Sequence, residues 1–342
     1  MSKKYFPIVI TCGDPSGVGP EVAVSAWKAL RDEIPLCILI DPNFLPKNIN
    51  VKILDQPPFA SDIERSSLTV IRHKFVEKRV PGKPNPKHAE AIIKVIERGV
   101  RFVKDGQCSA ICTMPISKSV LKDGANFPFP GHTEYLAHLD GRKNYGMMLV
   151  NKYLKVVPAT IHIPIKDITK YLNAELIEKT IKTTHQELTS RFSISNPSIW
   201  ISGLNPHAGE NGTIGDEEQK IIIPSIKKLR SKGYNLIGPV SADTMFYGKK
   251  RRNFDAAICM YHDQALIPIK TLDFHSSVNL TIGLSFIRTS PDHGTAFDIA
   301  GQNLANPKST IEAIKLAWNL VKFWPKDFFA FRSYLLMTCL IG

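Results

Sequence analysis

The chain has 342 residues, of which 43% are hydrophobic and 22% charged, a composition typical of a globular protein large enough for two packed lobes. Its formal net charge is +13, yet the basic residues are spread along expected helices, without a nucleic-acid-binding motif or interleaved aromatic residues. These properties favour a basic surface that attracts anionic metabolites over one that binds nucleic acid.

Short β-branched apolar runs alternate with longer helical patterns along the chain. This alternation predicts an α/β fold in which parallel strands are joined by crossover helices. The expected strands are 6–11, 36–40, 109–114, 156–162, 198–202, 256–261 and 278–281. The expected helices are 88–104, 174–192, 217–232 and 310–323.

The sequence shows no sign of secretion or of a membrane span. The first apolar run is interrupted by Pro7 and has no cleavage site, and no apolar stretch reaches the roughly 20 residues that a spanning helix needs. The cysteines form no CxxC pair, which argues against disulfides or a zinc–thiolate centre. They are Cys12, Cys37, Cys108, Cys112, Cys259 and Cys339. We therefore expect a cytoplasmic protein that binds no membrane.

Two polar segments follow or precede expected elements in the first part of the chain. Residues 11–21 lead from a strand through three glycines into a helix that Pro20 can start, and such backbone amides suit an anion. The glycine spacing matches neither a P-loop nor GxGxxG, so a tight turn is an equal alternative. In the second segment, His132 and Thr133 stand at the mouth of a helix, where Thr133 either caps the helix or contacts a ligand.

Three later segments each place one histidine at the end of an apolar strand. The residues are His162, His207 and His262. Because the carboxyl ends of parallel strands meet at one edge of a sheet, these imidazoles are candidates for a shared metal site with open coordination positions. The alternative is that each histidine is hydrogen-bonded separately in its own loop. Asn205, Glu210 and Asp263 lie near enough in sequence to orient these histidines.

Two cations stand among apolar residues after the third histidine. Lys270 offers a point charge and Arg288 a planar fork, which together suit a phosphate or a carboxylate. Each residue taken singly is more often a surface charge, but their apolar neighbours argue against full solvation.

Seven motifs occur together between about residues 8 and 324. They are GDPSGVGPE, GHTEYLA, ATIHIP, GLNPHAGENG, GPVSADTMF, YHDQALIPIK and VNLTIGLSFIRTSPDHGTAFDIAG. With this set, the chain closely resembles the 4-hydroxythreonine-4-phosphate dehydrogenase family of pyridoxal phosphate biosynthesis. It departs from the family in the tail after Trp324 and in the basic run 249–252, and neither departure predicts a function.

The resemblance implies roles for individual residues of this chain. A divalent metal, with zinc, magnesium and cobalt as candidates, would be bound by His162, His207 and His262. The substrate would be contacted by His132, Thr133, Lys270, Asn279 and Arg288. The nucleotide loop for NAD or NADP would include His293, Gly294 and Thr295.

The resemblance also implies an architecture. The fold would resemble that of isopropylmalate and isocitrate dehydrogenases, a two-lobed α/β/α sandwich with the active site in the cleft between lobes. Residues 1–130 with 295–342 would form one lobe, and residues 131–294 the lobe that binds metal and substrate and forms the dimer. The enzyme would be a homodimer whose active site lies at the subunit interface.

The implied reaction is the NAD-dependent oxidation of 4-phosphooxy-L-threonine to 2-amino-3-oxo-4-phosphooxybutanoate. This product decarboxylates to 3-amino-2-oxopropyl phosphate, in pyridoxine 5′-phosphate biosynthesis. Asp243 and Asp263 are the carboxylates considered for proton removal, and either can instead orient a histidine.

Three other functions remain open from the sequence. A sister activity would act on 4-phospho-threonate or 4-phospho-erythronate. A metal-dependent phosphoester hydrolase would use the three histidines to activate water. A non-catalytic anion-binding module is disfavoured, because it needs neither the histidines nor the nucleotide-like loop.

Overall fold

A computed structural model describes residues 6–323, which fall into two compact units. The first unit contains the described residues up to Gly141 and from Leu284 on, and the second is Arg142–Gly283. The second unit therefore begins and ends 11 residues inside the expected lobe (142 against 131, and 283 against 294). The C-terminal tail at 324–342 lies outside the described residues. No helix within residues 6–323 is long and apolar enough to cross a membrane.

The first unit contains a parallel sheet in the order β3-β4-β2-β1-β5-β12. Its strands are β1 (Ile8–Thr11), β2 (Leu36–Ile40), β3 (Val51–Leu54), β4 (Leu68–Arg72), β5 (Ala110–Thr113) and β12 (Arg288–Pro291). The central strands β1, β2 and β5 are buried along their whole length, as expected for a parallel sheet that is covered on both faces.

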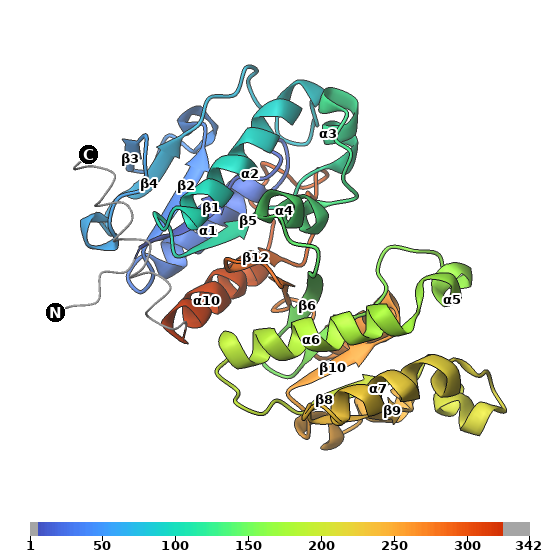
Figure 1. Cartoon of the computed structure of the whole chain (residues 1–342). Helices are drawn as coiled ribbons and strands as arrows, with labels where there is room; N and C mark the ends of the chain where they lie inside the picture. The colour runs from blue at the N-terminus through green and yellow to red at the C-terminus, as the bar shows by residue number, and fades with distance from the viewer. Residues whose placement is uncertain (1–5, 324–342) are drawn as a thin grey trace, which may run out of the picture. The chain divides into compact units, whose positions relative to one another are not determined.

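Helices cover both faces of this sheet (Figure 1). They are α1 (Gly19–Leu30), α2 (Ala89–Lys104), α3 (Lys118–Ala125), α4 (His132–Asp140) and α10 (Lys308–Phe323). Ile111 points at Gly99 of α2, whereas the next residue, Cys112, is paired with Thr289, whose hydroxyl donates to the carbonyl of Ala313 in α10. Because successive strand residues point to opposite faces, α2 and α10 lie on opposite sides of the sheet.

The second unit contains strands in the order β11-β6-β7-β10-β8-β9. They are β6 (Gly146–Val150), β7 (Lys155–Pro158), β8 (Ile199–Ser202), β9 (Leu236–Val240), β10 (Ala256–Cys259) and β11 (Val278–Ile282). Strand β6 runs antiparallel to both β11 and β7. The remaining neighbours β7, β10, β8 and β9 are parallel, so their carboxyl ends share one edge.

The helices of the second unit are α5 (Ile168–Tyr171), α6 (Ala174–Ser190), α7 (Ile223–Arg230), α8 (Ala242–Met245) and α9 (His262–Leu272). Among them, α6, α7 and α9 pack against strands of this sheet. Helix α9 buries Ala265 and Ile269 in an apolar cluster with Leu149, Val156 and Ala257 of β6, β7 and β10. Helix α6 packs on β10, β11 and α7. The core thus fixes the strands whose ends carry the three histidines.

The α/β class predicted from the sequence is confirmed, with local differences. The strand expected at 156–162 ends at Pro158, because the chain leaves the sheet and His162 takes the left-handed backbone conformation (φ 52°). The helix expected at 217–232 is divided into a π-helix (Glu218–Ile222) and α7, which has Pro224 in its first turn. Proline has no N–H for a helical hydrogen bond, so the pattern changes there.

Buried hydrogen bonds tie together the ends of β7, β10 and β8. The backbone carbonyl of Met260, just after β10, accepts from the Thr160 hydroxyl at 2.7 Å and from the Thr160 N–H at 3.2 Å. The Gln264 carboxamide oxygen accepts from the Met260 N–H and from the Ser202 hydroxyl, each at 2.7 Å. The amide nitrogen of Gln264 donates to the Gly203 carbonyl at 2.8 Å. One connected network therefore joins three strand ends.

We predict that Gln264→Leu lowers the free energy of unfolding by about 2–4 kcal/mol, because it leaves the Met260 N–H and the Gly203 carbonyl buried without their partner. Urea denaturation measures the change. The control is Gln186→Leu on the exposed face of α6, which should change the value by less than about 0.5 kcal/mol. Equal stability of the two variants would contradict this assignment.

Candidate active site

The three histidines follow three neighbouring parallel strands. His162 comes after β7, His262 is the first residue of α9 after β10, and His207 lies in a tight turn after β8. The strand order β7-β10-β8 places these segments at adjacent positions along one sheet edge. This is the arrangement that the sequence predicted from the recurrence of one histidine per strand end.

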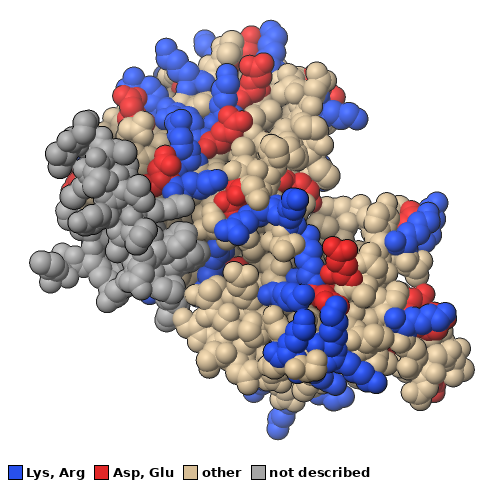
Figure 2. Space-filling view, in the orientation of Figure 1, with Lys and Arg blue, Asp and Glu red and all other residues tan. Residues whose placement is uncertain are grey.

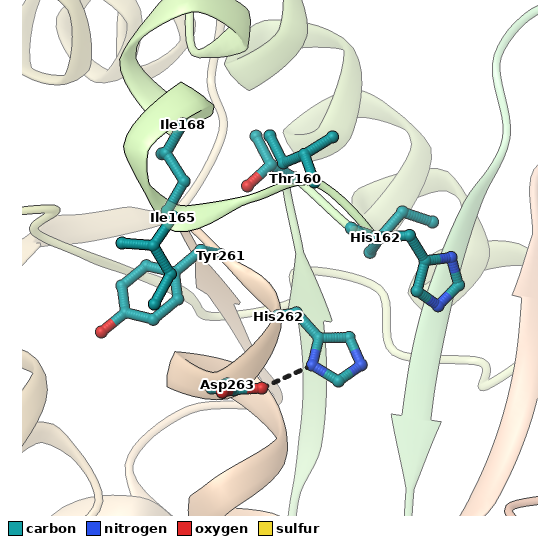
Figure 3. A pocket seen from close by; sticks show the side chains of 9 residues that line it. Thr160, His162, Ile165, Ile168, Tyr261, His262 and Asp263 are labelled. Carbon is teal, nitrogen blue, oxygen red and sulfur yellow. Dashed lines mark hydrogen bonds and ion pairs between the residues drawn. The ribbon is translucent and has the colours of Figure 1, made fainter.

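His162 and His262 lie close together beside a pocket. Their ring centroids are 5.8 Å apart, and both side chains line a pocket together with Thr160, Tyr261 and Asp263. Figure 3 shows the Asp263 carboxylate against the His262 ring, with Nδ1 of His262 at 2.7 Å from Oδ1 of Asp263. A carboxylate at Nδ1 favours the proton on that nitrogen and leaves Nε2 with a lone pair. His262 is therefore prepared to act as a ligand through Nε2.

His207 is exposed and sits in an unusual backbone segment. Its φ is 53°, and the left-handed conformation continues through Asn211. The exposed Asp243 of α8 lies near it: the hydrogen bond from Ser241 lowers the pKa of Asp243, and the charge of His207 contributes in the same direction. Asp243 is thus ionised at neutral pH and carries a negative charge near His207.

The donors fit a divalent metal in type and in strand position. All three are imidazoles at adjacent strand ends, and one already has the carboxylate partner that is common behind metal-binding histidines. Within residues 6–323 of the single chain, however, no three His, Cys, Asp or Glu side chains lie close enough together to hold an ion. The backbone brings the three segments to one edge, while the side chains are not gathered into a closed ligand set.

The second unit also contains two of the expected substrate residues. Lys270 is in the last turn of α9, with its ammonium 5.4 Å from the ring centroid of Phe274. Asn279 is in β11, and its Oδ1 is buried with no hydrogen-bond partner among the described residues. A buried amide oxygen without a partner is costly, so Asn279 fits a position that a ligand completes.

The first unit contains the other three expected substrate residues. His132 and Thr133 begin α4, and Arg288 begins β12. Arg288 is 2% exposed, donates to the Thr113 hydroxyl through Nε and Nη2 at 3.1 and 2.6 Å, and has its pKa lowered to about 10 by burial. Burial and then the nearby Arg288 charge lower the pKa of His132 well below its usual value. The structure thus brings a neutral imidazole next to a buried guanidinium.

The nucleotide loop expected at His293–Thr295 packs against the glycine-rich segment after β1. The Thr295 carbonyl accepts from the Val18 N–H at 2.9 Å, and a Cβ on Gly17 would lie 2.7 Å from the same oxygen. Gly17 therefore permits the two loops to touch. Nε2 of His293 is buried without a hydrogen-bond partner in the described part of the chain. Nothing in the sequence predicted a contact between these two segments, but in the fold they lie against each other.

Buried polar residues that support the histidines were not identified from the sequence. Gln264 lies in the same motif as His262, Asp263 and Lys270 but was not itself selected, and Glu218 was considered only as part of the expected helix 217–232. The structure shows both to be buried, at 9% and 1% exposure. The only sequence signal for Glu218 is its place just after a glycine-rich turn. The basic run 249–252 is largely exposed, and Lys and Arg side chains also lie elsewhere on the visible surface, with acidic residues among them (Figure 2).

Comparison with known proteins assigns the chain to a family. The model of the pyridoxal phosphate biosynthetic protein PdxA matches residues 22–317. The chain is 52% identical to the 4-hydroxythreonine-4-phosphate dehydrogenase of Roseobacter denitrificans, over 93% of this chain and 98% of the relative.

Solved structures agree with this assignment. The 4-hydroxythreonine-4-phosphate dehydrogenase of Klebsiella pneumoniae superposes with a TM-score of 0.84 at 34% identity, covering 92% of this chain and 99% of that one. A terephthalate 1,2-cis-dihydrodiol dehydrogenase from Burkholderia xenovorans is more distant, with a TM-score of 0.65 at 27% identity and coverage of 92% and 98%. On this basis the chain belongs to the pyridoxal phosphate biosynthetic protein PdxA family.

Proposed function

We propose that the chain is an NAD-dependent dehydrogenase that oxidises 4-phosphooxy-L-threonine to 2-amino-3-oxo-4-phosphooxybutanoate. This product would lose carbon dioxide to give 3-amino-2-oxopropyl phosphate, in pyridoxine 5′-phosphate biosynthesis. The observation that carries the proposal is the placement of His162, His207 and His262 at three adjacent strand ends, in a member of a family whose relatives are named for this substrate.

The substrate would be held by its phosphate and polar groups. Lys270 and Arg288 supply positive charge, and the Thr113 hydroxyl, which accepts from Nε and Nη2 of Arg288, fixes the plane of a guanidinium of the kind that suits a phosphate. His132 is neutral near pH 7, and its buried Nε2 has no hydrogen-bond partner among the described residues. Its ring can therefore form a hydrogen bond with the substrate without adding a charge to the site. Thr133 and Asn279 add a hydroxyl and an amide. These contacts to groups remote from the reacting carbon hold the substrate in one orientation.

The metal-binding residues would be His162, His207 and His262, and the nucleotide-binding residues His293, Gly294 and Thr295. When bound, a divalent metal supplies Lewis-acid polarisation of the substrate oxygen, and NAD or NADP accepts hydride. Asp263 holds the His262 ring in place, which leaves Asp243 as the other candidate acceptor for the alcohol proton. We further propose a cytoplasmic homodimer in which both subunits contribute to the site.

A sister activity on 4-phospho-threonate or 4-phospho-erythronate remains the second candidate. A more distant structural relative is a dihydrodiol dehydrogenase. Dehydrogenases with this fold therefore act on more than one kind of substrate. A metal-dependent phosphoester hydrolase is a third and weaker candidate.

We predict that purified protein with zinc, magnesium or cobalt reduces NAD in the presence of 4-phosphooxy-L-threonine, and that a chelator abolishes the reaction. Absorbance of NADH measures turnover, with 4-phospho-threonate and 4-phospho-erythronate tested in parallel. Higher kcat/KM for either of these two would favour the sister activity. Phosphate release without NAD would favour the hydrolase and contradict the proposal.

We predict that His207→Ala loses bound metal and at least about 100-fold in kcat/KM, because one of three imidazole donors is removed. Metal content and turnover are measured on the same preparation. His275→Ala is the control, since His275 is an exposed histidine of the second unit outside the three strand ends. Full activity of His207→Ala without bound metal would rule out the proposed site.

We predict that His132 makes the stability depend on pH. Its pKa is depressed in the folded state, while the unfolded chain has the ordinary value near 6.5. As pH falls below about 6.5, the unfolded state binds a proton that the native state does not, and stability is lost. Urea denaturation from pH 8 to pH 5 should therefore show the wild type losing more stability than His132→Gln. A difference between the two that does not change with pH would contradict the assignment.

A further inference from the structure

The turn that carries His207 has a strained backbone. Five consecutive residues, His207 to Asn211, have positive φ values of 53°, 53°, 77°, 40° and 57°. Gly209 adopts this conformation without a steric penalty and Asn211 tolerates it, whereas His207, Ala208 and Glu210 each cost on the order of 1 kcal/mol or more. Such a segment keeps its shape only if the surrounding structure holds it. The direction of the His207 side chain therefore depends on what braces the turn.

The brace is the carboxylate of Glu218, at the start of the π-helix that follows the turn. Its Oε1 accepts from the N–H groups of Leu204 and Asn205 at 2.7 and 2.8 Å, and its Oε2 accepts from the Asn205 side chain at 2.9 Å. The residue is only 1% exposed. Buried hydrogen bonds to a carboxylate are among the stronger ones in proteins. They fix the backbone two to three residues before His207.

Two glycines make room for this carboxylate on either side of His207. A Cβ on Gly203 would lie 3.0 Å from Oε1 of Glu218, and a Cβ on Gly209 would lie 2.6 Å from Oε2. Gly209 also has a positive φ of 77°. The turn thus wraps around the carboxylate, with contacts both before and after the histidine.

We propose that Glu218 is a positioning residue for the metal site, acting through the His207 turn. This inference rests on the proposed function. Glu218 is buried behind the turn, and its described hydrogen bonds go to Leu204 and Asn205. Its carboxylate holds the left-handed segment so that the imidazole is presented at the strand edge where His162 and His262 emerge. Loss of the carboxylate makes the backbone of the turn more mobile, so the His207 imidazole no longer keeps one orientation.

The experiment compares Glu218→Gln and Glu218→Ala with the control Glu175→Gln, an exposed glutamate on α6. In Glu218→Gln the new NH2 group faces the Asn205 side-chain donor, so part of the network is lost with little change in volume. Glu218→Asp tests rescue by a shorter carboxylate. Thermal melting identifies the variants that fold. If Glu218→Ala does not fold, Glu218→Gln still tests the proposal.

The first readout needs no metal and no activity. Amide hydrogen exchange over residues 204–213 should be at least about 10-fold faster in the metal-free Glu218 variants than in the wild type and in Glu175→Gln. The second readout is Zn²⁺ affinity, measured by competition with a chromophoric chelator. We expect affinity to fall about 10–100-fold in Glu218→Gln, with partial recovery in Glu218→Asp.

A double variant separates positioning from general destabilisation. If Glu218 acts through His207, adding Glu218→Gln to His207→Ala causes no further loss of Zn²⁺ affinity. Unchanged Zn²⁺ affinity in Glu218→Gln, alongside weakened affinity in His207→Ala, would overturn the positioning role alone. Unchanged affinity in His207→Ala itself would overturn the proposed metal site, and the positioning role with it.

Discussion

The buried carboxamide of Gln264 is the interaction on which the arrangement of the site depends. It binds the Met260 backbone N–H, the Ser202 hydroxyl and the Gly203 carbonyl, and Met260 in turn accepts from Thr160. Each of these groups lies at the end of a strand, within a few residues of a histidine. Because buried amides and carbonyls must be paired, the strand ends cannot separate without leaving polar groups unsatisfied. The histidines thus start from a fixed common edge.

The candidate site contains two kinds of residue: buried residues that hold the backbone, and exposed residues that we propose contact the ligand. Gln264 and Glu218 are buried and bind mainly backbone groups, whereas His207 and Asp243 are exposed. The buried set allows exposed side chains to stand in strained conformations that they would not keep alone. In the first unit, the Thr113 hydroxyl accepts two hydrogen bonds from the buried Arg288 guanidinium and fixes its orientation. Membership of the family indicates dehydrogenase chemistry, and these contacts fix the positions of the candidate site residues.

The sequence predicted the α/β class and the position of one histidine at each of three strand ends, because both follow from local pattern. The left-handed conformation of His162 and the braced turn around His207 were not predictable in this way. The His207 turn depends on contacts such as those of Glu218, which reach back across more than ten residues to Leu204. The contact between Gly17 and Thr295 was missed for the same reason, since it joins opposite ends of the sequence. Local sequence patterns reveal the periodicity of helices and strands. They do not identify which distant residue a buried polar group will bind.

Anomalous diffraction at the zinc absorption edge, from crystals of the zinc-loaded protein, tests directly whether the three histidines bind one metal ion. We predict one strong peak per site, with imidazole nitrogens of residues 162, 207 and 262 at about 2.0–2.1 Å from the ion, whether from one chain or from two. A zinc peak bound by other residues, or one from which His207 is absent, would contradict it.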